Sequence, residues 1–104
     1  MGWADFAIKA LQEGKTTTIK PTGNSMKGKV ESGSKVTVEP IPLDEIEIGD
    51  IVLCKVKGRQ YLHLVKAKDK GRFLIGNNRG YTNGWTSAIY GKATKIEKPK
   101  KKKK

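Results

Sequence analysis

The sequence is poor in residues that bind metals or cross-link chains: its 104 residues include one cysteine and one histidine. A single cysteine cannot form an internal disulfide, and one Cys with one His cannot supply the four ligands of a structural zinc site. No apolar run approaches the roughly 20 residues that span a bilayer, and the N-terminus lacks a basic region followed by an apolar core. We therefore expect a cytoplasmic single-domain protein with no metal, no cofactor and no membrane association.

Acidic residues are also few, with 10 Asp and Glu against 22 Lys and Arg and a net charge of +12. Six of these positive charges belong to Lys98 and Lys100–Lys104, which leaves +6 for residues 1–97. A terminal block of like charges repels itself and buries nothing, so residues 98–104 are expected to be a disordered tail. The same lysines could instead make non-specific contacts with nucleic acid or another acidic surface. The sequence leaves both interpretations open.

The first fifteen residues carry a helical pattern. Apolar residues at i, i+3, i+4, i+7 and i+8 predict a short amphipathic helix over residues 3–12 whose apolar face packs on the core. The residues of this face are Trp3, Phe6, Ala7, Ala10 and Leu11. Gly14 is the predicted C-terminal cap of the helix.

From Thr16 onward the pattern is that of short strands separated by Gly, Pro and Asn, which predicts a mainly β domain over residues 16–97. The expected strands are Thr16–Lys20, Lys35–Glu39, Asp50–Val56, Tyr61–Lys66, Arg72–Ile75, Ala88–Lys92 and Ala93–Glu97. The third and fourth of these flank Lys57-Gly58-Arg59 and predict a hairpin. Residues 76–85 are rich in Gly and Asn and are expected to form a long loop, the kind of segment that often carries function.

Two features indicate chemistry. Ser25 lies in the glycine-marked turn Gly23-Asn24-Ser25-Met26, and His63 lies in the apolar run Tyr61–Val65. A serine hydroxyl needs a neighbouring base before it can attack a carbonyl at neutral pH, and His63 is the one histidine of the chain. Such a lone histidine can also be a buried, hydrogen-bonded structural residue. Cys54, in another apolar run, is interpreted as a small buried hydrophobe and not as a nucleophile.

Several segments in this order resemble the superfamily of serine peptidases that includes signal peptidases and the self-cleaving, LexA-like repressors. Gly23-Asn24-Ser25-Met26 is similar to the nucleophile motif Gly-x-Ser-Met of that superfamily, and Gly49-Asp50-Ile51-Val52 to its Gly-Asp-Ile-Val segment. Tyr61–Val65 is similar to the strand that carries the general base, and Gly76-Asn77-Asn78 to the Gly-Asp/Asn-Asn motif. The resemblance covers about residues 19–97. It implies a coiled antiparallel β fold and a stand-alone catalytic core of bacterial or phage origin.

The resemblance also implies roles for single residues. Ser25 would be the nucleophile and His63 the general base, where bacterial signal peptidases carry a lysine. Gly23 replaces the hydroxyl residue of some signal peptidases, so the backbone alone, within Gly23-Asn24-Ser25-Met26, would hold the oxyanion. Asn77 would orient His63, in place of the aspartate of ER-type members; Asp50 and Asp69 are alternative candidates. Gly28 replaces the proline that commonly follows the Ser-Met pair.

Two classes of function follow. The first is a serine endopeptidase that acts on a protein or peptide substrate, with Asn78, Arg79 and Trp85 as its substrate or partner surface. The second is a non-catalytic β module that binds protein or nucleic acid through basic residues and aromatic platforms, Trp85 among them. Trp85 could equally be a lid over the active cleft. The sequence does not indicate the oligomeric state.

Overall fold

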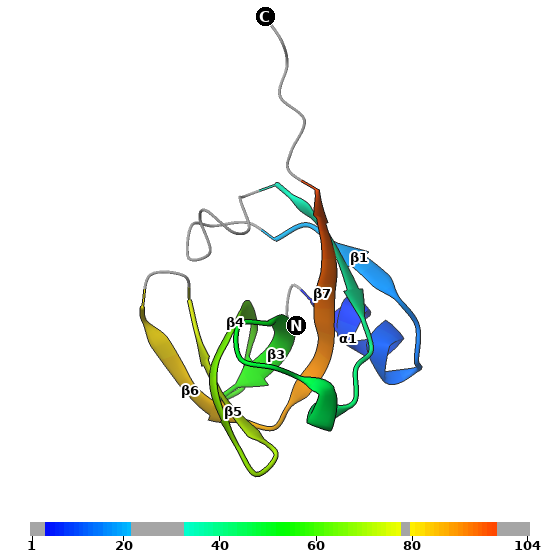
Figure 1. Cartoon of the computed structure of the whole chain (residues 1–104). Coiled ribbons are helices and arrows are strands. Elements are labelled where there is room, and N and C mark those ends of the chain that lie inside the picture. The colour runs from blue at the N-terminus through cyan, green and yellow to red at the C-terminus, as the bar shows by residue number, and fades with distance from the viewer. Residues whose placement is uncertain (1–3, 22–32, 78–79, 98–104) are drawn as a thin grey trace, which may run out of the picture.

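The computed structural model describes residues 4–21, 33–77 and 80–97, which form one helix, one short 3-10 turn and seven strands (Figure 1). The elements are α1 (Asp5–Gln12), β1 (Thr17–Ile19), β2 (Lys35–Glu39), η1 (Leu43–Glu45), β3 (Ile51–Val56), β4 (Arg59–Asp69), β5 (Arg72–Gly76), β6 (Thr82–Thr86) and β7 (Ile89–Glu97). The predicted fold class, a coiled antiparallel β structure with a short N-terminal helix, is confirmed. Within the described ranges, no helix has the length and apolar character needed to cross a membrane.

The seven strands form one antiparallel sheet with the order β1-β2-β7-β3-β4-β5-β6. The last strand in sequence, β7, therefore lies between β2 and β3 and joins the two halves of the sheet. Figure 1 shows β7 as the long strand with β1, β2 and α1 on one side and β3 to β6 on the other. The two halves of the sheet are therefore held together by pairings of the last described strand.

Helix α1 ends where the sequence predicts it. Gly14 has a φ of +81°, which glycine adopts without steric cost. Its N–H donates to the carbonyl of Leu11, and the N–H of Lys15 donates to that of Ala10. These two bonds define a Schellman motif, so the prediction of Gly14 as the C-terminal cap is confirmed.

The buried face of α1 differs from the predicted one. Ala4, Ala7, Ile8 and Leu11 are buried, whereas the side chain of Phe6 is 61% exposed. The four buried positions follow the spacing i, i+3, i+4 and i+7, and Phe6 lies outside this stripe. The predicted stripe was anchored on Trp3, which lies outside the described residues.

The buried side chains form two clusters, one on each face of the central strands. The first packs α1 against β1, β2 and the adjoining face of β3 and β4, and includes Leu11, Val36 and Leu53. The second includes Val52 and Phe73 from β3 and β5. Because successive side chains of a strand point to opposite faces, β3 supplies Leu53 to one cluster and Val52 to the other.

Strands β3 to β6 curl around the second cluster. The hydroxyl of Thr86, at the end of β6, donates to the carbonyl of Lys55 on β3 at 2.7 Å. The N–H of Lys55 donates to the carbonyl of Ala88 at 3.0 Å. A Cβ on Gly84 would lie 3.3 Å from a methyl of Val56. The edge strand β6 thus lies against β3. The face of β3 to β6 that carries the second cluster is therefore the inner face, and it encloses a partly closed interior.

The β3–β4 hairpin is confirmed, with a tighter turn than predicted. Lys57 and Gly58 have φ values of 52° and 83°, and Arg59 already belongs to β4. Positive φ at both central residues is typical of the type I′ turn, whose twist matches that of the flanking strands.

Two predicted boundaries were wrong. Residues 76–85 are not one long loop, because β6 occupies Thr82–Thr86 and pairs with β5. The two predicted final strands are one strand, β7, with a bulge between the pairs Thr37–Lys95 and Val38–Ala93. In both cases backbone pairing with a neighbouring strand outweighs local composition.

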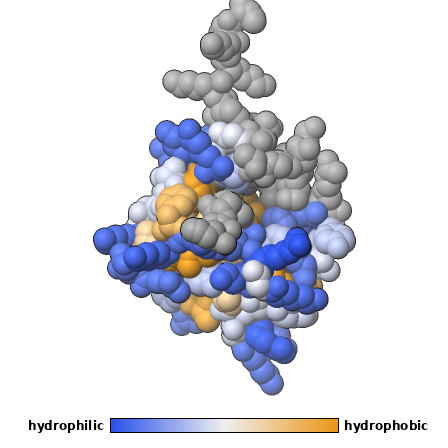
Figure 2. Space-filling view, turned by 180° about the vertical axis from the view of Figure 1, so that it is seen from behind, coloured by the Kyte–Doolittle hydropathy of each residue, from blue (hydrophilic) through white to orange (hydrophobic). Residues whose placement is uncertain are grey.

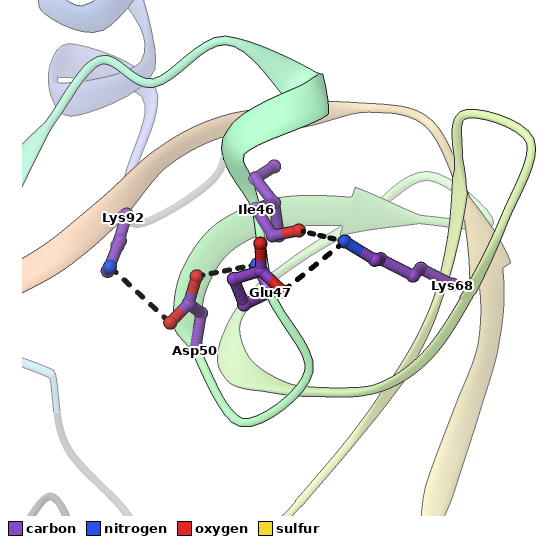
Figure 3. A network of polar contacts seen from close by, with 5 residues as sticks. All are labelled: Ile46, Glu47, Asp50, Lys68 and Lys92. Atoms are coloured by element: carbon purple, nitrogen blue, oxygen red, sulfur yellow. Dashed lines mark hydrogen bonds and ion pairs between the residues drawn. The ribbon is translucent and has the colours of Figure 1, made fainter.

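The connection between β2 and β3 is tied to the sheet by a polar network (Figure 3). Asp50 accepts a hydrogen bond from the N–H of Glu47 at 2.8 Å and faces Lys92 of β7 at 3.4 Å. Lys68 of β4 donates to the carbonyl of Ile46 at 3.0 Å and lies 3.4 Å from the carboxylate of Glu47. The carboxylate of Asp50 thus fixes the turn that leads into β3 and joins it to β7.

Candidate active site

His63 lies in the middle of β4, opposite Val52 of β3, and is 7% exposed. The alternation of β4 places its side chain on the same face as Tyr61 and Val65, both of which belong to the second cluster. The imidazole thus points into the interior that β3 to β6 enclose. The ring of Tyr61 lies beside it, with a centroid separation of 4.9 Å and an interplanar angle of 34°.

Asn83 of β6 is a hydrogen-bond partner of this histidine. Its Oδ1 lies 2.8 Å from Nδ1 of His63. The register of β5 and β6 shifts between the pairs Ile75–Gly84 and Gly76–Thr82, which leaves Asn83 as the extra residue of a β-bulge. Bulges often redirect a side chain next to a functional site, and this one turns Asn83 toward the interior.

The hydrogen bond determines which nitrogen of His63 can act as a base. A carboxamide oxygen only accepts hydrogen bonds, so Nδ1 must carry the proton. In the neutral ring Nε2 then holds the lone pair. Burial lowers the pKa of His63 from its ordinary value of 6.5, and the hydrogen bond to Asn83 partly opposes this shift. The imidazole is therefore neutral, and able to accept a proton at Nε2, at physiological pH.

Asn77, the residue expected to orient His63, lies in the turn between β5 and β6. Its N–H donates to the carbonyl of Tyr81 at 2.8 Å, and its Oδ1 accepts from the N–H of Tyr81 at 3.0 Å. These bonds close the turn that leads into β6. The orienting role of Asn77 stays a prediction.

Asn83 was missed at the level of sequence. Asn83-Gly84 reads as a turn signal, and it stands in a segment that carries no alternation of apolar residues. No spacing rule identifies the extra residue of a bulge, because the bulge depends on how β6 pairs with β5. The one available signal was the position of a third asparagine near the end of the predicted loop.

The predicted nucleophile segment, Gly23, Asn24, Ser25 and Met26, lies outside the described residues, and so does Gly28. Pro21 follows β1, and its carbonyl accepts a hydrogen bond from the N–H of Gly33 at 3.1 Å. Pro21 and Gly33, the described residues that flank this segment, therefore lie side by side. The distance between Ser25 and His63 stays a prediction.

Two of the other candidates have different roles. The carboxylate of Asp50 contacts Glu47 and Lys92, as described above. Asp69 ends β4, six residues after His63, which corresponds to about 20 Å along an extended strand. Neither observation supports an orienting role. Burial raises the pKa of the Cys54 thiol to about 12, which agrees with its interpretation as a small buried hydrophobe.

Of the residues expected at a substrate or partner surface, Asn78 and Arg79 lie outside the described residues. Trp85 is 45% exposed and pairs with Leu74, on the face of β5 opposite to Phe73 and Ile75. The bulge at Asn83 separates the two side chains, because Asn83 turns inward and Trp85 outward. Trp85 thus faces away from His63, and the lid interpretation gains no support.

In the part of the chain that the structure describes, no group of three or more His, Cys, Asp or Glu side chains could hold a metal ion. A comparison with curated proteins gave no match. A comparison with models of protein families matched residues 4–94 to the family described as Peptidase S24-like. This match covers α1, all of β1 to β6 and most of β7, and it confirms the resemblance found in the sequence motifs. The chain therefore belongs to the Peptidase S24-like family.

Proposed function

We propose that this protein is a serine peptidase in which Ser25 is the nucleophile and His63 the general base. The observation that carries the proposal is the setting of His63. It is buried on the inner face of β4, its Nδ1 donates to Asn83, and its pKa is lowered. These are the requirements of a base that must be neutral before it can accept a proton.

The reaction follows the general course of serine acyl transfer. Oγ of Ser25 attacks a peptide carbonyl, and its proton passes to Nε2 of His63 as the new C–O bond forms. The backbone N–H of Ser25 stabilises the negative charge on the carbonyl oxygen. The imidazolium then gives its proton to the departing amine, and the C–N bond breaks. A water molecule, deprotonated by His63, hydrolyses the resulting ester.

Asn83 has a positioning role in this scheme. By accepting from Nδ1–H it holds the imidazole in one tautomer and one orientation. An amide carries no charge, so it stabilises the imidazolium less than the aspartate of a Ser-His-Asp triad does. The proposed site therefore combines a well-oriented base with a weakly stabilised protonated form.

Labelling with a fluorophosphonate, a serine-directed covalent probe, tests the proposal. The unmodified chain should be labelled, and Ser25→Ala should remove the label while the free energy of unfolding changes by under about 1 kcal/mol. His63→Gln should also lose labelling, because the serine then lacks its base. Ser87→Ala, at an exposed serine before β7, is the matched control and should label normally. Equal labelling of the Ser25→Ala chain would end the proposal.

A further inference from the structure

The outer face of β5 and β6 carries an exposed aromatic side chain between two basic ones. We define the outer patch as Lys66, Arg72, Leu74 and Trp85. Trp85 is 45% exposed and lies opposite the half-buried Leu74, so its ring is presented on the surface of the sheet. Tyr81, which is 68% exposed, precedes β6 in the adjoining turn. Large aromatic side chains with this exposure are suited to stacking on a planar ligand.

The basic residues of the outer patch lie near the two ends of β5: Arg72 is its first residue, and Lys66 belongs to the neighbouring strand β4. The guanidinium carbon of Arg72 is 6.0 Å from the centroid of the Trp85 ring. At the other end, the stem of Lys66 crosses Gly76, and its Cε would lie 2.9 Å from a Cβ built there. Gly76 is four positions after Arg72, which corresponds to about 13 Å along an extended strand. One basic side chain thus starts at the first residue of β5, and the other, from β4, lies over the last.

The charge distribution of the chain favours a polyanion at this patch. Residues 51–97 contain ten Lys and Arg but two acidic residues, Asp69 and Glu97. Asp69 is the residue opposite Arg72 in the backbone register of β4 and β5. Four other carboxylates belong to residues 44–50, where Glu47 and Asp50 contact Lys68 and Lys92 (Figure 3). Figure 2 shows that hydrophilic side chains dominate the face seen from behind, with hydrophobic areas scattered among them.

We propose that the outer patch binds single-stranded nucleic acid, with a base stacked on Trp85 and backbone phosphates in contact with Arg72 and Lys66. A stacking aromatic combined with flanking cations is the arrangement by which sheet surfaces bind single strands without sequence preference. The guanidinium of Arg72 lies over the ring of Trp85, so it brings a positive charge next to the proposed stacking platform. The patch lies on the face of the sheet opposite to His63, so this binding does not depend on the proposed peptidase activity.

Fluorescence anisotropy of a labelled oligothymidine of about 12 nucleotides, a length within the range that one binding module covers, tests the proposal at low salt. In the full chain, Trp85→Leu should weaken binding by about 10-fold because the stacking platform is lost. Arg72→Gln should reduce the slope of log K against log salt by about one phosphate contact. Phe6→Leu, at an aromatic residue of α1 that is 61% exposed, is the matched control and should bind normally.

A second measurement separates the outer patch from the lysine tail. In a Trp3→Phe chain Trp85 is the one remaining tryptophan, and its fluorescence should be quenched by the oligonucleotide but not by heparin, a polyanion without bases. Deletion of residues 98–104 should weaken binding at low salt and leave the quenching in place. Binding that disappears with the tail, binding that is insensitive to Trp85→Leu in the folded variant, or a bound state without quenching would overturn the proposal.

Discussion

The hydrogen bond between His63 and Asn83 predicts how the histidine will respond to a single change of charge. In the variant Asn83→Asp a carboxylate replaces the carboxamide whose oxygen lies 2.8 Å from Nδ1. Opposite charges centred about 4 Å apart interact by about 4 kcal/mol at an effective dielectric constant of 20. Because the introduced carboxylate is itself buried, we expect the pKa of His63 to rise by about 1–3 units.

Nuclear magnetic resonance can follow this pKa without ambiguity, because His63 is the one histidine of the chain. In the unmodified protein the imidazole resonances should titrate below 6.5, the ordinary pKa, because burial lowers the pKa of His63. In the Asn83→Asp variant they should titrate above that value. The measurement needs no substrate, so it tests the site independently of catalysis.

Asn77→Asp is the matched comparison, since it makes the same chemical change in the turn before β6. The carboxamide of Asn77 accepts from the N–H of Tyr81, so its replacement should move the pKa of His63 less than the change at Asn83 does. A larger effect at Asn77, or a titration of His63 that ignores Asn83→Asp, would refute the assignment of Asn83 as the positioning residue.

Three further predictions concern stability. The unfolded chain binds a proton at His63 more readily than the folded one, so the free energy of unfolding should fall as the pH drops below about 6.5. The urea midpoint of the unmodified chain should therefore fall between pH 7 and pH 5 by more than that of His63→Gln. The same change of midpoint in both chains would contradict this prediction. Leu53→Ala, at a fully buried side chain of the first cluster, should cost about 2–5 kcal/mol, whereas Ile48→Ala at an exposed position should cost under about 0.5 kcal/mol. Gly91→Ala should cost about 1–3 kcal/mol in the same urea assay, because its Cβ would lie 2.7 Å from the carbonyl oxygen of Glu39; an unchanged midpoint would show that the backbone can yield there.

Asn83 carries no charge, and this limits how well the proposed site stabilises a protonated His63. A base with a lowered pKa is a weaker proton acceptor, and an amide does not compensate for the positive charge that develops on the ring. Asn83→Asp should therefore raise the rate of probe labelling at alkaline pH, where His63 is neutral. Such an increase would indicate that the partner of His63 can stabilise the charge on the ring in addition to orienting it.

The sequence alone determined the local features of this protein. Alternation of apolar residues predicted β2 and the β3–β4 hairpin, because a half-buried strand must present one face to a core. Gly14 marked the end of α1, because few residues other than glycine adopt positive φ at a helix terminus. The ordered motifs around Ser25 and His63 identified the family that the comparison confirmed.

Tertiary structure decided the features that depend on pairing between distant segments. The strand β6 carries almost no apolar pattern, and it exists because the unpaired edge of β5 offers its backbone a partner. The bulge within that pair turns Asn83 toward His63 and Trp85 toward solvent. A hydrogen bond between residues 20 positions apart depends on how three strands curl around a shared interior, and no local preference of the chain encodes that curvature.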